Sequence, residues 1–222
     1  MHHRRAALTL TLAAGLFTTL TPTASAWSIA PEFAEPVLAA GEAVPKNAKS
    51  AAANAVRADR KAPAATFTDA DGQSVELAKL LENGPVVLIF YRGGWCPYCV
   101  EQLKAFNKQH DAIEAAGGRV VAVSTELPEF VAKTKEKSKL GFDVLSDPGA
   151  KVSRAFGVAW ANERYGRVSK IAQANGNERG EIPLGVTYVI DTDGTVRWAF
   201  LEHDYKKRAT PEQVVEALNA ID

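Results

Sequence analysis

From Pro63 to the end of the chain, short hydrophobic runs alternate with amphipathic stretches and turn residues. The runs at residues 86–91 and 119–125 are continuous and rich in β-branched side chains, which is typical of strands buried on both faces of a sheet. Apolar residues recurring every three or four positions predict a helix over residues 97–116. Residues 128–139 predict another helix, whose Lys- and Glu-rich side faces solvent.

Shorter segments complete this pattern. Strands are expected at residues 65–68, 74–77, 142–145, 187–190 and 195–201, the last two forming a hairpin around Asp191-Thr192-Asp193-Gly194. Helices are expected at residues 78–82 and 150–156, at residues 165–174 as an insertion, and from Thr210 to the end. Strands that alternate with helices, followed by a hairpin and a helix, predict an α/β fold with a central mixed β-sheet flanked by helices.

The first 26 residues have the pattern of a secretory signal peptide. A short basic segment precedes an uncharged apolar stretch at residues 6–20, and Ala24-Ser25-Ala26 offers the small residues that signal peptidase accepts. A membrane anchor is the weaker alternative, because about 15 apolar residues are too few to span a hydrocarbon core about 30 Å thick. We therefore expect cleavage after Ala26 and export to the periplasm or the cell exterior. Arg4-Arg5 matches a twin-arginine signal poorly.

Residues 27–62 are an N-terminal extension or linker of Ala, Pro and polar residues. Their second half is rich in Ala, which favours a helix, so the segment is either a tether or a helix laid on the domain surface. Weak order is expected before Pro63. The folded domain is expected to span residues 63–222.

Charge and hydrophobicity restrict the classes of partner. The formal net charge is zero, so nothing indicates binding to nucleic acid or to an anionic membrane surface. No stretch after the predicted signal is long and apolar enough for a stable membrane anchor. The hydrophobic fraction of 46% and the charged fraction of 23% are those of a soluble globular domain.

Candidate chemistry is concentrated between Tyr91 and Cys99, a segment that follows a predicted buried strand and opens a predicted helix. Cys96 and Cys99 are the only cysteines of the chain. A C-x-x-C pair at a helix start within a βαβ pattern is typical of thioredoxin-like redox proteins. Free N–H groups and the helix dipole favour a thiolate in the first turn. Arg92 adds a positive charge nearby.

Two other uses of these cysteines are less favoured. A structural disulfide gains stability by closing a long loop, and a bridge between residues three apart closes almost none. A structural zinc site needs four ligands, but the chain has no second C-x-x-C or H-x-x-H pair, and His110 and His203 are isolated. Thiol redox chemistry is therefore expected, with neither a metal nor a cofactor.

The segment Phe90-Tyr91-Arg92-Gly93-Gly94-Trp95-Cys96-Pro97-Tyr98-Cys99 resembles the alkyl hydroperoxide reductase/thiol-specific antioxidant (peroxiredoxin-like) family of the thioredoxin superfamily, in the branch with an R-G-x-W-C-P-x-C motif. Residues 187–194 resemble the late strand and turn of that family. Asp204-Tyr205, Arg208 and Pro211-Glu212 resemble its C-terminal stretch. The resemblance covers residues 63–222 and implies a thioredoxin-like fold and an antioxidant thiol enzyme.

In this resemblance Cys99 corresponds to the peroxidatic cysteine of the family. Cys96 stands where the family has a Thr, and Arg92 stands where it has a Pro. The Arg that the family carries just before the late strand has no counterpart, because Gly185 falls there. Gly185 also replaces a Pro that related proteins tend to have, and Pro183 either compensates for it or bends the loop. These departures leave the type of thiol chemistry open.

Three functional hypotheses follow. In a peroxidase, Cys99 attacks the peroxide with help from Arg92, Cys96 condenses with the sulfenic acid, and a thioredoxin-like donor reduces the disulfide. In a reductase of protein disulfides, an exposed Cys96 attacks and Cys99 resolves. A non-catalytic binding module would use the cleft beside Trp95 and Tyr98. A homodimer is one possible assembly, and His203, Asp204 and Arg208 are expected to be surface charges.

Overall fold

The computed structural model describes residues 31–39, 42–166, 169–176 and 179–221. The predicted signal peptide lies outside these residues. Among the described residues, no helix is both long and apolar enough to cross a membrane.

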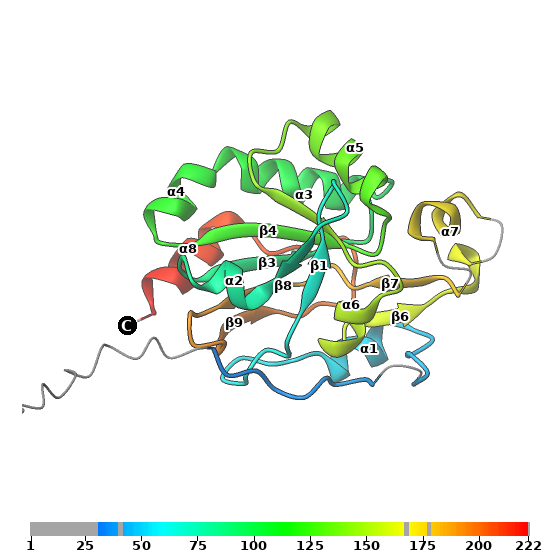
Figure 1. The fold of residues 1–222 in the computed structure, drawn as a ribbon, viewed down its shortest axis with the longest axis horizontal. Helices are drawn as coiled ribbons and strands as arrows, with labels where there is room; N and C mark the ends of the chain where they lie inside the picture. The colour runs from blue at the N-terminus through cyan, green and yellow to red at the C-terminus, as the bar shows by residue number, and fades with distance from the viewer. Residues whose placement is uncertain (1–30, 40–41, 167–168, 177–178, 222) are drawn as a thin grey trace, which may run out of the picture.

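A mixed seven-stranded sheet forms the centre of the fold, with the strand order β2-β1-β5-β4-β3-β8-β9 (Figure 1). Its strands are β1 (Thr66–Thr68), β2 (Ser74–Glu76), β3 (Val86–Phe90), β4 (Arg119–Ser124), β5 (Asp143–Ser146), β8 (Thr187–Ile190) and β9 (Val196–Phe200). β3, β4 and β5 run parallel, whereas β8 and β9 are antiparallel to their neighbours. A separate antiparallel pair contains β6 (Ala159–Ala161) and β7 (Glu181–Pro183).

Helices cover both faces of the sheet (Figure 1). One face packs against α3 (Pro97–Lys108), α4 (His110–Ala115), α5 (Pro128–Ser138) and α8 (Pro211–Asn219). The other face packs against α1 (Ala48–Asn54), α2 (Leu77–Leu81) and α6 (Lys151–Ala155). The 3-10 helix η1 (Glu163–Tyr165) and α7 (Lys170–Asn175) lie between β6 and β7.

β3 shows why the sheet is buried on both sides. Its side chains alternate, with Val86, Leu88 and Phe90 in the core under α1, α2 and α6, and Val87 and Ile89 in the core under α3, α4, α5 and α8. All five are fully buried. The prediction of a strand buried on both faces is therefore confirmed. The cysteine motif follows directly after this strand.

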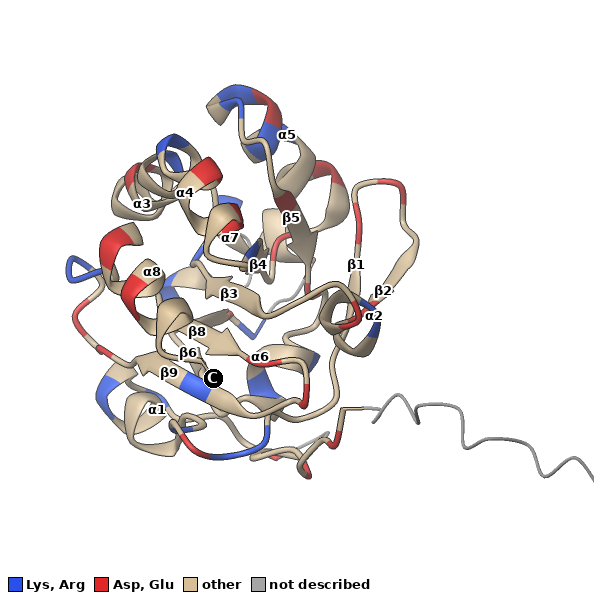
Figure 2. Cartoon of the chain, turned by 90° about the vertical axis from the view of Figure 1, so that its left-hand side faces the viewer, with Lys and Arg blue, Asp and Glu red and all other residues tan. Residues whose placement is uncertain are grey.

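Most predicted elements are present, but two predicted helices need correction and one pair of strands was missed. Residues 97–116 form two helices rather than one, because Gln109 leaves the helical region at φ −106° and ψ 14°. The insertion helix begins at Lys170 rather than at residue 165. β6 and β7 were not predicted. The solvent face of α5 carries the expected mixture of Lys and Glu (Figure 2).

The expectation of weak order before Pro63 is wrong for the described part of the extension. Ala51, Ala55 and Ala62 are buried in the core under α1, α2 and α6. Backbone hydrogen bonds attach this segment to the domain, for example from Val56 N–H to the Phe156 carbonyl at 3.0 Å. The extension therefore contributes to the hydrophobic core, because small Ala side chains let its backbone approach closely.

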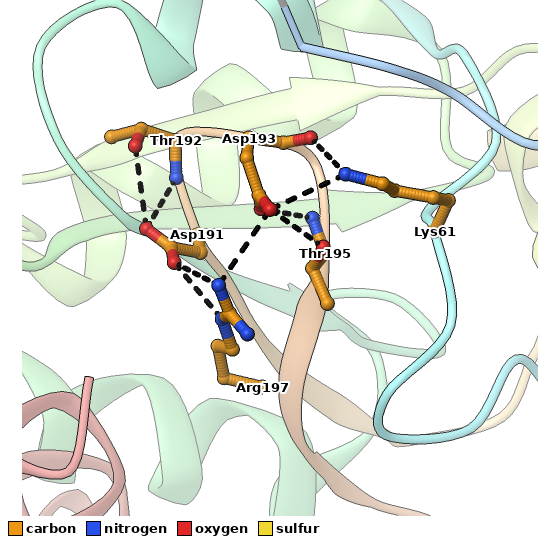
Figure 3. Close-up of polar contacts among 6 residues, drawn as sticks. All are labelled: Lys61, Asp191, Thr192, Asp193, Thr195 and Arg197. Atoms are coloured by element: carbon orange, nitrogen blue, oxygen red, sulfur yellow. Dashed lines mark hydrogen bonds and ion pairs between the residues drawn. The ribbon is translucent and has the colours of Figure 1, made fainter. Parts of the chain in front are cut away.

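A polar network joins the same segment to the predicted β8–β9 hairpin (Figure 3). Lys61 Nζ donates to the Asp193 carbonyl at 2.8 Å and forms an ion pair with the Asp193 carboxylate at 3.3 Å. Arg197 binds the Asp191 carboxylate through Nε at 2.9 Å. The carboxylates of the turn are thus engaged in structural contacts. The turn lies at the start of β3, whereas the cysteine motif follows its end.

Candidate active site

The two cysteines lie together at the N-terminus of α3. Cys96 is the N-cap residue, Pro97 occupies the first helical position, and Cys99 lies in the first turn. The Cys99 thiol donates to the Cys96 sulfur across 2.7 Å, and both cysteines are free. Only 1% of Cys96 and none of Cys99 is exposed, so the expectation of an exposed Cys96 is wrong. A small oxidant has a clear advantage over a protein disulfide in reaching such sulfurs.

The two thiols have opposite pKa shifts. The hydrogen bond from Cys99 lowers the pKa of Cys96 to about 6, and the positive charges of Arg92 and Arg208 act in the same direction. Burial, together with the bond to Cys96, raises the pKa of Cys99. The pair therefore loses its first proton more easily than a free thiol does, and the resulting negative charge is held mainly on Cys96, with the remaining proton on Cys99.

Arg208 lies against this pair, so the expectation that it is a surface charge is wrong. Its Nη2 donates to the Cys99 sulfur at 3.4 Å, and its Nη1 donates to the Gly185 carbonyl at 2.9 Å. The positive charge of Arg208 lowers the pKa of Cys99 against the larger effect of burial. The guanidinium can stabilise a thiolate on Cys99 and the negative charge that develops on an oxygen bound there.

Gly185 makes room for Arg208. A Cβ atom at residue 185 would collide with the guanidinium of Arg208. The position from which the family Arg is missing is therefore filled by a guanidinium that comes from the segment before α8. The sequence comparison identified the vacancy, but only the tertiary structure shows which residue fills it.

Arg92 lies beside the cysteine pair, with its guanidinium in a cluster of aromatic rings. Its guanidinium lies over the rings of Trp95, Tyr165 and Tyr205, at 5.0, 5.5 and 4.7 Å from their centroids. Its Nη2 donates to the Tyr165 hydroxyl at 2.5 Å. Arg92 is buried and influences Cys96 through its charge, while Arg208 supplies the side-chain contact to a sulfur.

The remaining candidates divide between the site and the surface. Trp95 is half-buried and packs against the core under α3, α4, α5 and α8 as well as against Tyr165. Tyr98 is 37% exposed and forms an edge contact with Tyr205. His203 is exposed, in agreement with its predicted surface position.

Comparisons with known proteins confirm the family that the sequence resembles. A sequence model of the AhpC/TSA family matches residues 58–199. A chloroplastic peroxiredoxin Q of Suaeda salsa is 29% identical over 172 residues, which are 78% of this chain and 70% of that protein. A putative peroxiredoxin of Mycobacterium tuberculosis is 33% identical over 136 residues, which are 61% of this chain and 79% of that protein.

Solved structures extend the comparison to three dimensions. Peroxidoxin BcpB of Mycobacterium tuberculosis superposes with a TM-score of 0.60 at 24% identity, over 75% of this chain and 99% of that chain. Reduced Prx3 of Vibrio vulnificus superposes with a TM-score of 0.62 at 18% identity, over 73% and 99%. These likenesses confirm the predicted thioredoxin-like fold. The family match spans more than half of the sequence, and the chain therefore belongs to the AhpC/TSA family.

Proposed function

We propose that the protein is a thiol-dependent antioxidant peroxidase that reduces peroxides through Cys96 and Cys99. The observation that carries this proposal is the contact of the Arg208 guanidinium with the sulfur of a fully buried Cys99. Membership of the AhpC/TSA family and the likeness to peroxiredoxins support it. Burial of both sulfurs also favours a small peroxide as substrate.

The first step needs a thiolate on Cys99. Because the sulfurs are 2.7 Å apart, the shared proton moves to Cys96 over a short distance, and Arg208 stabilises the charge left on Cys99. The Cys99 thiolate attacks the terminal oxygen of the peroxide, forming an S–O bond as the O–O bond breaks. The alkoxide that leaves takes the proton from Cys96, which becomes a thiolate again.

The second step closes the pair. The Cys96 thiolate attacks the sulfur of the Cys99 sulfenic acid, the S–S bond forms as the S–O bond breaks, and the hydroxide that leaves becomes water by taking up a solvent or buffer proton. One peroxide is thereby reduced to an alcohol, or to water, and two thiols are oxidised. A thioredoxin-like dithiol donor then reduces the disulfide in the proposed cycle.

The low pKa of Cys96 favours a second candidate function, a dithiol reductase in which Cys96 attacks a protein disulfide and Cys99 resolves the mixed disulfide. Two assays on the reduced protein separate the candidates: consumption of hydrogen peroxide with dithiothreitol as reductant, and reduction of insulin disulfides. The peroxidase proposal predicts fast peroxide consumption and slow insulin reduction. The reverse ranking supports the reductase, and inactivity in both assays supports a binding module.

Export and assembly are further parts of the proposal. The basic and apolar segments before Ala26 support a cleaved signal peptide and a periplasmic or secreted enzyme. N-terminal sequencing of protein from the extracytoplasmic fraction should therefore begin at Trp27, and an intact Met1 in a membrane pellet would overturn export. A homodimer is the assembly to test, by sedimentation of the reduced protein.

A further inference from the structure

Glu126 is a buried carboxyl group that the proposed reaction does not use. It follows β4, and only 3% of it is exposed. Its backbone is fixed on two sides, because its N–H donates to Ser124 Oγ at 3.0 Å and its carbonyl accepts from Ser146 Oγ at 2.5 Å. The side chain is thus held rigidly at the end of two neighbouring strands and points toward the loop that carries the cysteines.

One peptide group connects Glu126 to Cys96. Glu126 Oε2 accepts the N–H of Gly94 at 2.8 Å, and the carbonyl of Gly93 accepts the N–H of Cys96 at 3.0 Å. The Gly93 carbonyl and the Gly94 N–H belong to the same planar peptide. A carboxylate on the N–H side polarises this peptide and strengthens the bond on the carbonyl side.

The glycines on both sides of this peptide allow the close approach. A Cβ atom on Gly93, which has φ +145°, would collide with the Trp95 indole and would also lie 3.0 Å from Glu126 Cδ. A Cβ atom on Gly94 would collide with the Thr134 hydroxyl. The Gly93–Gly94 pair therefore lets a buried side chain bind the backbone directly before the redox pair.

The surroundings of Glu126 let its charge vary. Burial raises the pKa of Glu126 to about 7, against the opposing effect of the Gly94 hydrogen bond. Glu126 also lines a cavity of about 470 Å³ between α3, α5 and α7, through which protons can exchange. The titratable and charged groups around it come from four segments: Tyr91 after β3, Lys104 of α3, Lys133 and Lys137 of α5, and Lys170 of α7.

We propose that Glu126 is a positioning residue that holds the backbone of Cys96 through the Gly93–Gly94 peptide and loosens it on protonation. A neutral carboxyl is a weaker acceptor than a carboxylate, so acidification weakens both hydrogen bonds of the peptide. The dithiol loop is therefore tightest when Glu126 is ionised. The inference concerns the backbone of the site and stands whether the enzyme reduces peroxides or disulfides.

The test uses the full chain carrying Cys96→Ser and Cys99→Ser, which removes the thiol titrations. The amide proton shift of Gly94 and the carboxyl carbon shift of Glu126 are followed by NMR against pH. Both should titrate with one shared midpoint near 7. In the added Glu126→Gln variant the Gly94 shift should stay constant, whereas the exposed neighbour variant Glu129→Gln should keep the titration.

A Gly94 amide proton shift that does not change with pH in the double Ser protein would overturn the proposal. So would a Gly94 titration whose midpoint differs from that of the Glu126 carboxyl carbon. A titration that survives in Glu126→Gln would overturn it as well. Because none of these measurements depends on catalysis, an inactive enzyme leaves their outcome unaffected.

Discussion

The guanidinium of Arg208 lies 3.4 Å from the sulfur of Cys99, although 109 residues separate the two in the chain. The contact joins the segment before α8 to the first turn of α3, and it exists because Gly185 leaves the intervening space free. Burial disfavours a thiolate on Cys99, and the fixed cation beside the sulfur offsets part of that cost when negative charge develops there. The predictions below start from this relationship.

Replacing Arg208 with Ala should slow the reaction with hydrogen peroxide by about 10²-fold, the usual effect of losing one donor to a developing charge. Stopped-flow measurement of thiol oxidation provides the rate. Lys207→Ala is the matched control, because the Lys207 side chain is 65% exposed, and it should react at the wild-type rate. An Arg208→Ala protein as fast as the Lys207→Ala protein would remove Arg208 from the mechanism.

Gly185→Ala should reproduce most of the defect of Arg208→Ala, since the new methyl group displaces the guanidinium from Cys99. The double variant should be hardly slower than either single variant, because both remove the same contact. Gly141→Ala is the control, as a Cβ atom there meets only ordinary contact with Asn107 at 3.5 Å. Fully additive effects of Gly185→Ala and Arg208→Ala would show that the two residues act independently.

Cys99→Ala should raise the pKa of Cys96 above its value of about 6, because the largest cause of the lowering is the hydrogen bond from Cys99. Cys99→Ser keeps a donor at this position and should raise the pKa less. Thiolate absorbance at 240 nm, followed against pH, measures both variants. An unchanged midpoint in Cys99→Ala would assign the low pKa to the helix N-terminus and the nearby arginines instead.

Glu126 should make the protein less stable as pH rises from about 4.5 to about 7. Its pKa is higher in the folded than in the unfolded state, so in this window the folded state binds more protons, and deprotonation favours unfolding. The loss is on the order of 3 kcal/mol. Urea unfolding should show a smaller decrease with pH for Glu126→Gln than for the wild type, with Glu129→Gln like the wild type. Parallel pH profiles for all three proteins would contradict the assignment.

The local parts of the fold were predictable because their signals are local. The buried run of β3, the Asp-Gly turn of the hairpin and the capping residues before α8 each lie within a few positions of the element that they define. β6 and β7 escaped prediction because each has three residues and is stabilised by pairing across an insertion. The weak order expected of the extension rested on its composition. Composition does not show that its Ala residues pack into the core under α1, α2 and α6.

The same distinction applies to the site. Cys96, Cys99 and Arg92 were found from one contiguous motif, and the helix start explains why the thiols meet. Three further residues of the site come from other segments of the chain: Arg208, Tyr165 and Glu126. Their proximity to the cysteine motif depends on the tertiary fold and cannot be read from the sequence. Two signals for Arg208 were available in the sequence: the missing family Arg at Gly185, and the resemblance of Arg208 to the C-terminal stretch of the family.

The most direct test of the proposed peroxidase is to locate the first oxidised sulfur. Reduced Cys96→Ser and Cys99→Ser proteins are treated with one equivalent of hydrogen peroxide and a sulfenic-acid probe, and the adducts are mapped by mass spectrometry. We predict an adduct on Cys99 in Cys96→Ser, none in Cys99→Ser, and a Cys96–Cys99 disulfide in the wild type. An adduct on Cys96 alone would invert the roles of the cysteines. Unreacted thiols in all three proteins would contradict the peroxidase account.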